Sequence, residues 1–77
     1  MKEIDLNNIK IGDKAIVKKV LNDNSIKRRL LDIGLTKGTV VEKVLENFHG
    51  NLFAYMIRGA LIAIRDDDAK KIIVEVS

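Results

Sequence analysis

The sequence lacks cysteine, proline and tryptophan, and it contains a single histidine. Without cysteine, disulfides and thiolate metal sites are excluded, and the composition suits a reducing cytoplasm. One histidine cannot build a tetrahedral nitrogen and sulfur site within one chain. The five glycines never form the phosphate-binding pattern that a following Lys-Ser/Thr completes. We therefore expect no metal ligands, no nucleotide bound by that mechanism and no cofactor.

Long apolar runs are absent as well. None approaches the roughly 20 residues of a membrane span, and the first residues carry no apolar signal core. We therefore expect a cytoplasmic protein without a membrane span. The 77 residues allow one domain, residues 1–77. Apolar residues make up 47% of the chain and charged residues 32%, which is ordinary globular composition.

The net charge of +3 is unevenly spread along the chain. Residues 1–38 hold nine Lys/Arg against five Asp/Glu, a balance of +4, and residues 39–77 hold five against six, a balance of −1. A basic half can meet nucleic acid, an anionic membrane or an acidic protein surface. It can equally be a solvated face, and both interpretations stay open.

The first predicted strand covers residues 14–21, where isoleucine and valine are frequent. The pair Lys18-Lys19 interrupts its alternation. A bulge at this pair would place three apolar side chains on one face, namely Ala15, Val17 and Val20.

A short helix is predicted after this strand. Asn24 or Ser25 can cap its first free amides, and it runs to about Ile33. At 100° per residue, Ile26, Leu30 and Ile33 share one narrow stripe that must dock on the rest of the chain.

Gly34 fits the left-handed position that ends a helix. Leu35 can then fold back onto Leu30, which is the usual hydrophobic partner in that motif.

The remainder of the chain is predicted to form mainly strands. We expect strands over residues 39–48, 53–58 and 61–65, one helical turn over residues 66–70, and a last strand over residues 72–76. This order predicts a mainly β fold: a small SH3-like barrel of about five strands, with a short α-helix inserted after strand 1 and a helical turn before the last strand. Closure of the barrel would remove exposed sheet edges.

Catalytic residues are not indicated. His49 sits beside a glycine turn, and nothing in the spacing pairs it with Ser25 or a third orienting group. We expect a solvent-facing turn residue and no enzyme activity. The run Asp66-Asp67-Asp68 is expected to cap the helical turn, because three consecutive acids do not easily converge on one ion. A metal site is the alternative interpretation of that run.

The densest basic cluster is Lys27-Arg28-Arg29, and Lys37 follows ten residues after its first member. Leu31 lies about 100° from Leu30 on the helical wheel, outside the apolar stripe. It can pack against the barrel rim or, if exposed, anchor a partner protein.

Nucleic acid is a weaker candidate partner. Small barrels that bind RNA usually add stacking aromatic residues to a basic face. The aromatic supply here consists of Phe48, Phe53 and Tyr55, and we expect the two phenylalanines in the core.

The segment RRLLDIGLTKGT at residues 28–39 resembles the signature of the FeoA family, which comprises small cytosolic accessories of ferrous iron transport. The later segments AYMIRG (54–59), LIAIR (61–65) and DAKKI (68–72) match the same pattern in order. The resemblance extends from about residue 6 to residue 76. Lys37 stands where the family often has proline, and Asn51-Leu52 also lacks a common proline.

The resemblance implies an SH3-like barrel with no catalysis of its own, acting through the cytosolic region of a FeoB-type ferrous iron transporter. That partner would recruit the chain to the inner face of the membrane. The family is sometimes credited with transition-metal binding, and a similar domain forms the carboxy-terminal module of iron- and manganese-dependent repressors. A metal-sensing domain and a nucleic-acid-binding barrel are therefore the alternatives, and a strand edge or the leucine of the basic helix could support weak self-association. The candidate partner-binding residues are Lys27, Arg28, Arg29, Leu31 and Lys37.

Overall fold

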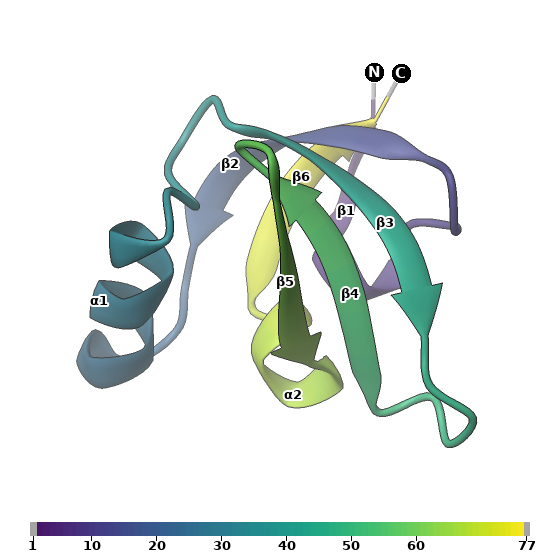
Figure 1. The fold of residues 1–77 in the computed structure, drawn as a ribbon. Coiled ribbons are helices and arrows are strands. Elements are labelled where there is room, and N and C mark those ends of the chain that lie inside the picture. Colours follow the sequence, from purple (N-terminus) through teal and green to yellow (C-terminus); the bar gives the residue numbers. More distant parts are fainter. Residues whose placement is uncertain (1, 77) are drawn as a thin grey trace.

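The chain forms one strongly bent antiparallel sheet with a helix beside it, as described by a computed structural model of residues 2–76 (Figure 1). Each predicted element is present, with ends that agree to within about two residues. The elements are β1 (Lys2–Asp5), the 3-10 helix η1 (Leu6–Asn8), β2 (Lys14–Val20), α1 (Asn24–Asp32), β3 (Val40–Glu46), β4 (Leu52–Ile57), β5 (Ala60–Arg65), α2 (Asp66–Ala69) and β6 (Ile72–Val76).

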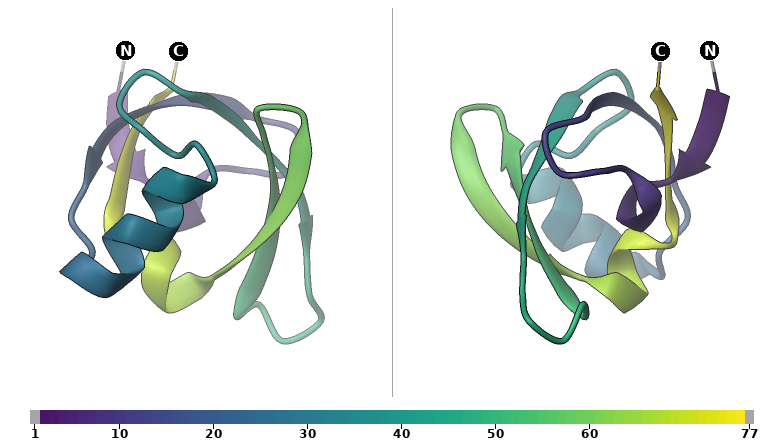
Figure 2. Two further views of the ribbon diagram at one scale, coloured as in Figure 1. Left: turned by 60° about the vertical axis from the view of Figure 1, so that its left-hand side comes forward. Right: turned by 90° about the vertical axis from the view of Figure 1, so that its right-hand side faces the viewer.

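The strand order across the sheet is β1-β6-β2-β3-β4-β5, and every neighbouring pair is antiparallel. The last strand lies between β1 and β2, so Lys2 pairs with Val76. Figure 2 shows the sheet coiling around its interior, with α1 at one side and α2 below. The mainly β architecture, with a helix between β2 and β3 and a helical turn before the last strand, confirms the predicted fold class.

Two details of the predicted barrel are wrong. The described chain has six strands, because the polar segment Lys-Glu-Ile-Asp of β1 becomes a strand only by pairing with β6. The sheet is also not closed, since β1 and β5 do not pair within residues 2–76. Instead α2, which follows β5, packs against η1, which follows β1. The Asn7 amide donates to the Asp66 carboxylate at 2.8 Å across this contact, so helical segments occupy the place where closing strands would meet.

The core lies inside the curve of the sheet and is almost entirely aliphatic. Inward-facing residues alternate along the strands, as in Phe53, Tyr55 and Ile57 of β4, and Leu6 and Leu35 from outside the strands complete the core. Each large side chain buried in this way contributes about 1.5–3 kcal/mol relative to exposure.

The bulge predicted in β2 is confirmed. The pairing of β2 with β6 shifts register between Val17 and Lys19. Ala15 and Val17 are buried and Val20 is half-buried, so these three side chains share the inner face as expected.

A buried lysine in β3 was not predicted. The Lys43 side chain lies inside the fold, where its ammonium donates to the carbonyls of Asn7 at 3.1 Å and Ile9 at 3.0 Å. The same nitrogen lies 3.9 Å from the centroid of the Phe53 ring, a cation–π contact. Lys43 thus fastens η1 and the residue that follows it to the middle of the sheet.

The N-cap of α1 is Asp23, one residue before the first of the two predicted capping positions. The Asp23 carboxylate, rather than Asn24 or Ser25, accepts from the backbone amide of Ile26 at 3.3 Å. A carboxylate also complements the positive end of the helix dipole.

The predicted end of α1 is confirmed. Gly34 has φ +94°, the Leu35 amide donates to the Leu30 carbonyl at 2.9 Å, and the Gly34 amide donates to the Leu31 carbonyl at 3.0 Å. These two bonds define a Schellman motif. Leu30 and Leu35 are both buried, so the motif fixes the helix against the core.

Candidate partner-binding site

The five predicted partner-binding residues lie in three different places in the structure. Lys27, Arg28 and Leu31 are exposed on the outside of α1, and we call these three residues the outer α1 surface. Leu31 is 45% exposed, which settles the alternatives in favour of a solvent-facing leucine. Lys37 is exposed in the turn that leads to β3, and Arg29 turns instead toward β5.

None of these basic residues is neutralised within the described chain. Between residues 2 and 76 the ion pairs are Lys18–Glu75, Lys43–Glu46 and Lys70–Asp67. The cluster on α1 therefore presents its positive charge to solvent, where it can meet acidic groups of a partner.

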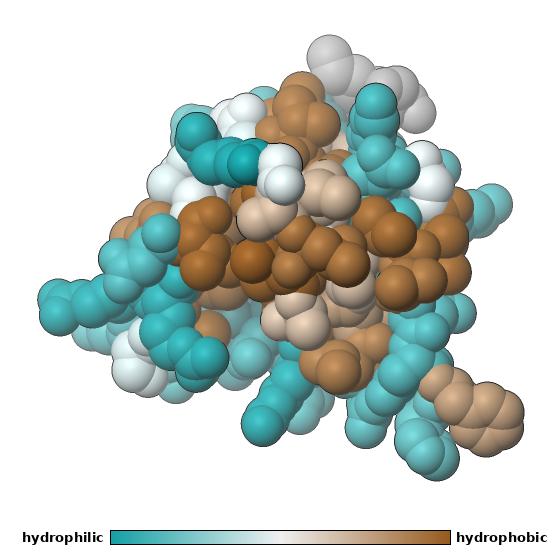
Figure 3. Space-filling view, viewed as in Figure 1, coloured by the Kyte–Doolittle hydropathy of each residue, from teal (hydrophilic) through white to brown (hydrophobic). Residues whose placement is uncertain are grey.

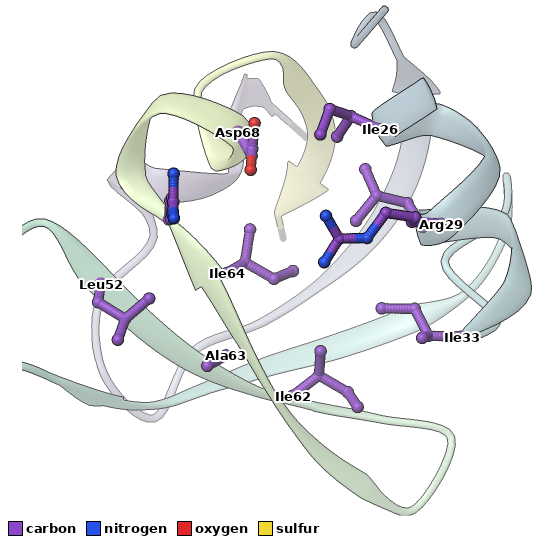
Figure 4. A pocket seen from close by; sticks show the side chains of 10 residues that line it. Ile26, Arg29, Ile33, Leu52, Ile62, Ala63, Ile64 and Asp68 are labelled. Atoms are coloured by element: carbon purple, nitrogen blue, oxygen red, sulfur yellow. The ribbon is translucent and has the colours of Figure 1, made fainter. Parts of the chain in front are cut away.

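A groove separates α1 from β5. It has a volume of about 380 Å³ and combines apolar walls with two arginines and one aspartate. Figure 4 shows the Arg29 side chain reaching from α1 toward Ile64 of β5, between Ile26 and Ile33. The groove is lined by Ile26, Arg29, Leu30 and Ile33 of α1, Ile62, Ala63, Ile64 and Arg65 of β5, Leu52 and Asp68.

Apolar side chains also gather on the outer face of β3, β4 and β5. Figure 3 shows them as a band across the middle of that face, with hydrophilic side chains around it. The strand pairing brings Ala54 opposite Ala63 and Met56 opposite Leu61. We call this surface the β3–β5 apolar face; its exposed members are Leu45, Leu52, Met56, Leu61 and Ala63.

Arg58 connects the turn between β4 and β5 to the end of α1. Its Nε donates to the Gly34 carbonyl at 3.0 Å, and its Nη2 donates to Thr39 Oγ1 at 3.3 Å. Thr39 Oγ1 in turn donates to the Gly34 carbonyl at 2.9 Å. Arg58 belongs to the AYMIRG segment noted in the sequence, but no role was predicted for it, because its hydrogen-bond partners lie 19 and 24 residues away.

The run Asp66-Asp67-Asp68 and the single histidine interact with neighbouring side chains. The expected side-chain cap is not formed: the N-cap position of α2 is Arg65, and the three acids lie in the first turn of the helix. The Asp66 carboxylate accepts from Asn7, and Asp67 pairs with Lys70 at 3.3 Å. His49 is exposed, and its ring lies edge-on to Phe48 with centroids 5.5 Å apart. Across residues 2–76, no three His, Cys, Asp or Glu side chains converge in a way that could hold a metal ion.

One titratable group in the core is strongly shifted. Burial raises the pKa of the Tyr55 hydroxyl well above its usual value of about 10, and the carboxylates of Asp66 and Glu46 raise it further. The hydroxyl donates to the Leu6 carbonyl at 3.2 Å. Tyr55 therefore acts as a neutral donor inside the fold, away from the exposed basic surface.

The helices in the described part of the chain are too short and too polar to cross a membrane. Six antiparallel strands in this order, with a helix after β2 and a helical turn before β6, define a small SH3-like domain with an open sheet.

A family model, the FeoA domain, matches residues 4–76. The chain therefore belongs to the FeoA family, a family linked to iron transport and made up of small accessory domains. The sequence resemblance noted above is thereby confirmed. A comparison with curated protein sequences found no match.

Solved structures of FeoA proteins share this fold. A FeoA protein from Chlorobium tepidum is 29% identical with a TM-score of 0.91, and the match covers 95% of this chain and 70% of that chain. A FeoA-like protein from Clostridium acetobutylicum is 30% identical with a TM-score of 0.87, and the match covers 99% of this chain and 88% of that one.

The fold also occurs as part of longer proteins. A manganese-dependent transcriptional repressor matches with a TM-score of 0.87 at 17% identity, over 97% of this chain and 42% of the repressor. At this identity the likeness concerns the fold alone.

Proposed function

We propose that this chain is a non-catalytic accessory protein of ferrous iron transport that binds the cytosolic region of a FeoB-type transporter. Membership of the FeoA family supports the link to iron transport. In this proposal the chain works in the cytoplasm, and binding to the transporter recruits it to the inner face of the membrane.

The observation that carries the proposal is the outer α1 surface. It places an exposed leucine, Leu31, on the same short helix as the unpaired cations of Lys27 and Arg28. An apolar anchor rimmed by charge is a common centre of a protein interface. Such a surface suits a partner that offers an apolar pocket surrounded by carboxylates.

The helix is also held firmly enough to serve as a recognition element. Asp23 caps its start, the Schellman motif at Gly34 ends it, and Leu30 docks it on the core. A nine-residue helix without such support would not persist in water. The fold therefore presents the basic residues and Leu31 in a fixed geometry.

Nucleic acid fits this surface less well. Of the three aromatic residues considered for base stacking, Phe53 and Tyr55 are buried. Phe48 was expected in the core, and this prediction is wrong: Phe48 is exposed because it lies in the β3–β4 loop. That loop is at the opposite side of the molecule from α1 (Figure 1). The basic helix therefore lacks the adjacent stacking platform of single-strand binding proteins.

The test is a titration of isotope-labelled chain with the transporter's cytosolic domain, followed by NMR. We expect shifts at residues 24–38 and at least about a tenfold loss of affinity in Leu31→Ala and Arg28→Glu. Ile11→Ala and Lys10→Glu are the controls, because they make a comparable truncation and the same reversal of charge sign at exposed positions in the loop before β2. Equal losses in the controls, or no binding by the intact chain, would refute the proposal.

A further inference from the structure

Strand β5 is an uncovered edge of the sheet. The Asp66 amide donates to the Asn51 carbonyl at 2.9 Å, so Asp66 belongs to the set of residues whose backbone faces β4. Backbone groups of alternate residues point to opposite sides of an antiparallel strand. Leu61, Ala63 and Arg65 therefore direct their amides and carbonyls away from β4, to the side where no strand lies within residues 2–76.

The groove between α1 and β5 runs beside this free edge. Its apolar walls come from both elements, with Ile26 and Ile33 on the helix side and Ile62 on the strand side. An exposed row of strand backbone next to an apolar groove is the arrangement that accepts an added strand from another chain.

The charges around the groove specify the chemistry of that strand. Arg29 and Arg65 both line the groove, and Asp68 is the single acid among its lining residues. Neither arginine takes part in an ion pair in the described part of the chain. The groove therefore has an excess of one positive charge. Because guanidinium groups bind carboxylates in a bidentate manner, this charge favours an acidic residue in the added strand.

We infer that an extended segment of a partner protein, carrying apolar residues at alternate positions and at least one carboxylate, adds to β5 as a seventh strand. Side chains on its inner side enter the groove between α1 and β5. Those on its outer side continue the β3–β5 apolar face beside Leu61 and Ala63, since alternate side chains of a strand point to opposite faces. Its carboxylate pairs with Arg29 or Arg65.

This inference rests on the proposed function for the identity of the partner, because it assigns the segment to the transporter's cytosolic region. A second copy of this chain is a less suitable occupant. Pairing two β5 edges would bring together two grooves that each carry an excess of positive charge.

The substitution Ala63→Pro tests the backbone pairing directly. The Ala63 amide points away from β4, so proline removes a donor to the added strand while leaving the β4–β5 ladder intact. We expect affinity for the cytosolic domain to fall at least about tenfold, and to fall much less in Ala63→Val, which changes the side chain at the same contact but keeps the amide.

A second measurement uses the unmodified chain and does not depend on the folding of a variant. In the free chain the amides of Leu61, Ala63 and Arg65 should exchange rapidly with solvent, and binding of the cytosolic domain should slow them. Those of Ile62 and Ile64, already paired with β4, should change much less.

The outcomes separate the two proposals. Binding that leaves the three edge amides unprotected, with shifts confined to the outer α1 surface, would overturn the seventh strand and retain the proposed function. No binding at all would overturn both. Protection that grows with the concentration of the chain alone, together with dimers in sedimentation, would identify self-association through β5 and also overturn this inference.

Discussion

Arg58 and Gly34 lie in direct contact, with Arg58 Nε 3.0 Å from the Gly34 carbonyl oxygen. The approach is possible because Gly34 has no side chain. A Cβ at this position would overlap Arg58 Cδ and lie 2.7 Å from its Nε. The end of α1 and the turn between β4 and β5 therefore depend on each other through a single glycine.

Gly34→Ala should destabilise the fold for two reasons, namely strain at φ +94° and overlap with Arg58. Gly38→Ala causes the same backbone strain, at φ +92°, but its Cβ would have no neighbour within 4 Å. We expect about 1–2 kcal/mol for Gly38→Ala and at least about 1 kcal/mol more for Gly34→Ala in urea unfolding. Equal losses would show that Arg58 moves aside without cost.

Lys43→Met should lower stability by about 1–3 kcal/mol, because it leaves the carbonyls of Asn7 and Ile9 without their donor. Lys14→Met at an exposed position is the control and should change stability by less than about 0.5 kcal/mol. Chemical denaturation measures both. A neutral result for Lys43→Met would mean that water or a rearranged backbone satisfies the two carbonyls.

The raised pKa of Tyr55 predicts that the fold loses stability in alkaline solution. The tyrosine ionises near pH 10 in the unfolded chain but only at higher pH in the folded chain, so above pH 10 the unfolded state binds fewer protons. Its contribution to the free energy of unfolding is complete below pH 10 and falls by up to about 1.4 kcal/mol per pH unit above it.

Ultraviolet absorbance measures the ionisation of Tyr55, which is the only tyrosine in the chain. The native protein should show no phenolate near pH 10. Tyr55→Phe should flatten the alkaline decline in stability relative to the original chain. A native phenolate signal with an ordinary midpoint would contradict the buried environment described here.

Asp23→Ala should cost about 1 kcal/mol through loss of the helix cap, whereas Asn24→Ala should be nearly neutral. The two substitutions are adjacent and both residues are exposed, so the pair isolates the capping bond. Thermal or urea unfolding of the two variants gives the comparison. A larger loss of stability for Asn24→Ala would show that Asn24, one of the positions expected from sequence, caps the helix.

Local patterns predicted the elements well. The stripe of Ile26, Leu30 and Ile33, and the Gly34-Leu35 helix end, depend on neighbours within a few residues, and each is found in the structure. The bulge in β2 was visible because two lysines interrupt an apolar alternation.

The features that sequence reasoning missed depend on distant partners. β1 is a strand only because β6 lies beside it, and the sheet stays open because α2 and η1 pack where strands would have paired. Lys43 is buried because its ammonium donates to carbonyls of residues more than 30 positions away in the sequence. Adjacency in the sequence also grouped Arg29 with Lys27 and Arg28, although the position of β5 assigns Arg29 to the groove.

The contact between Arg58 and Gly34 bears on how the groove can recognise a ligand. One wall of the groove is α1, whose C-terminal capping motif includes Gly34, and the other is β5, which begins directly after the Arg58-Gly59 turn. Arg58 fixes the spacing of the two walls at that end before any ligand arrives. For the seventh strand that we infer at this groove, such preorganisation removes an ordering cost from association, so a short segment suffices although it buries little surface.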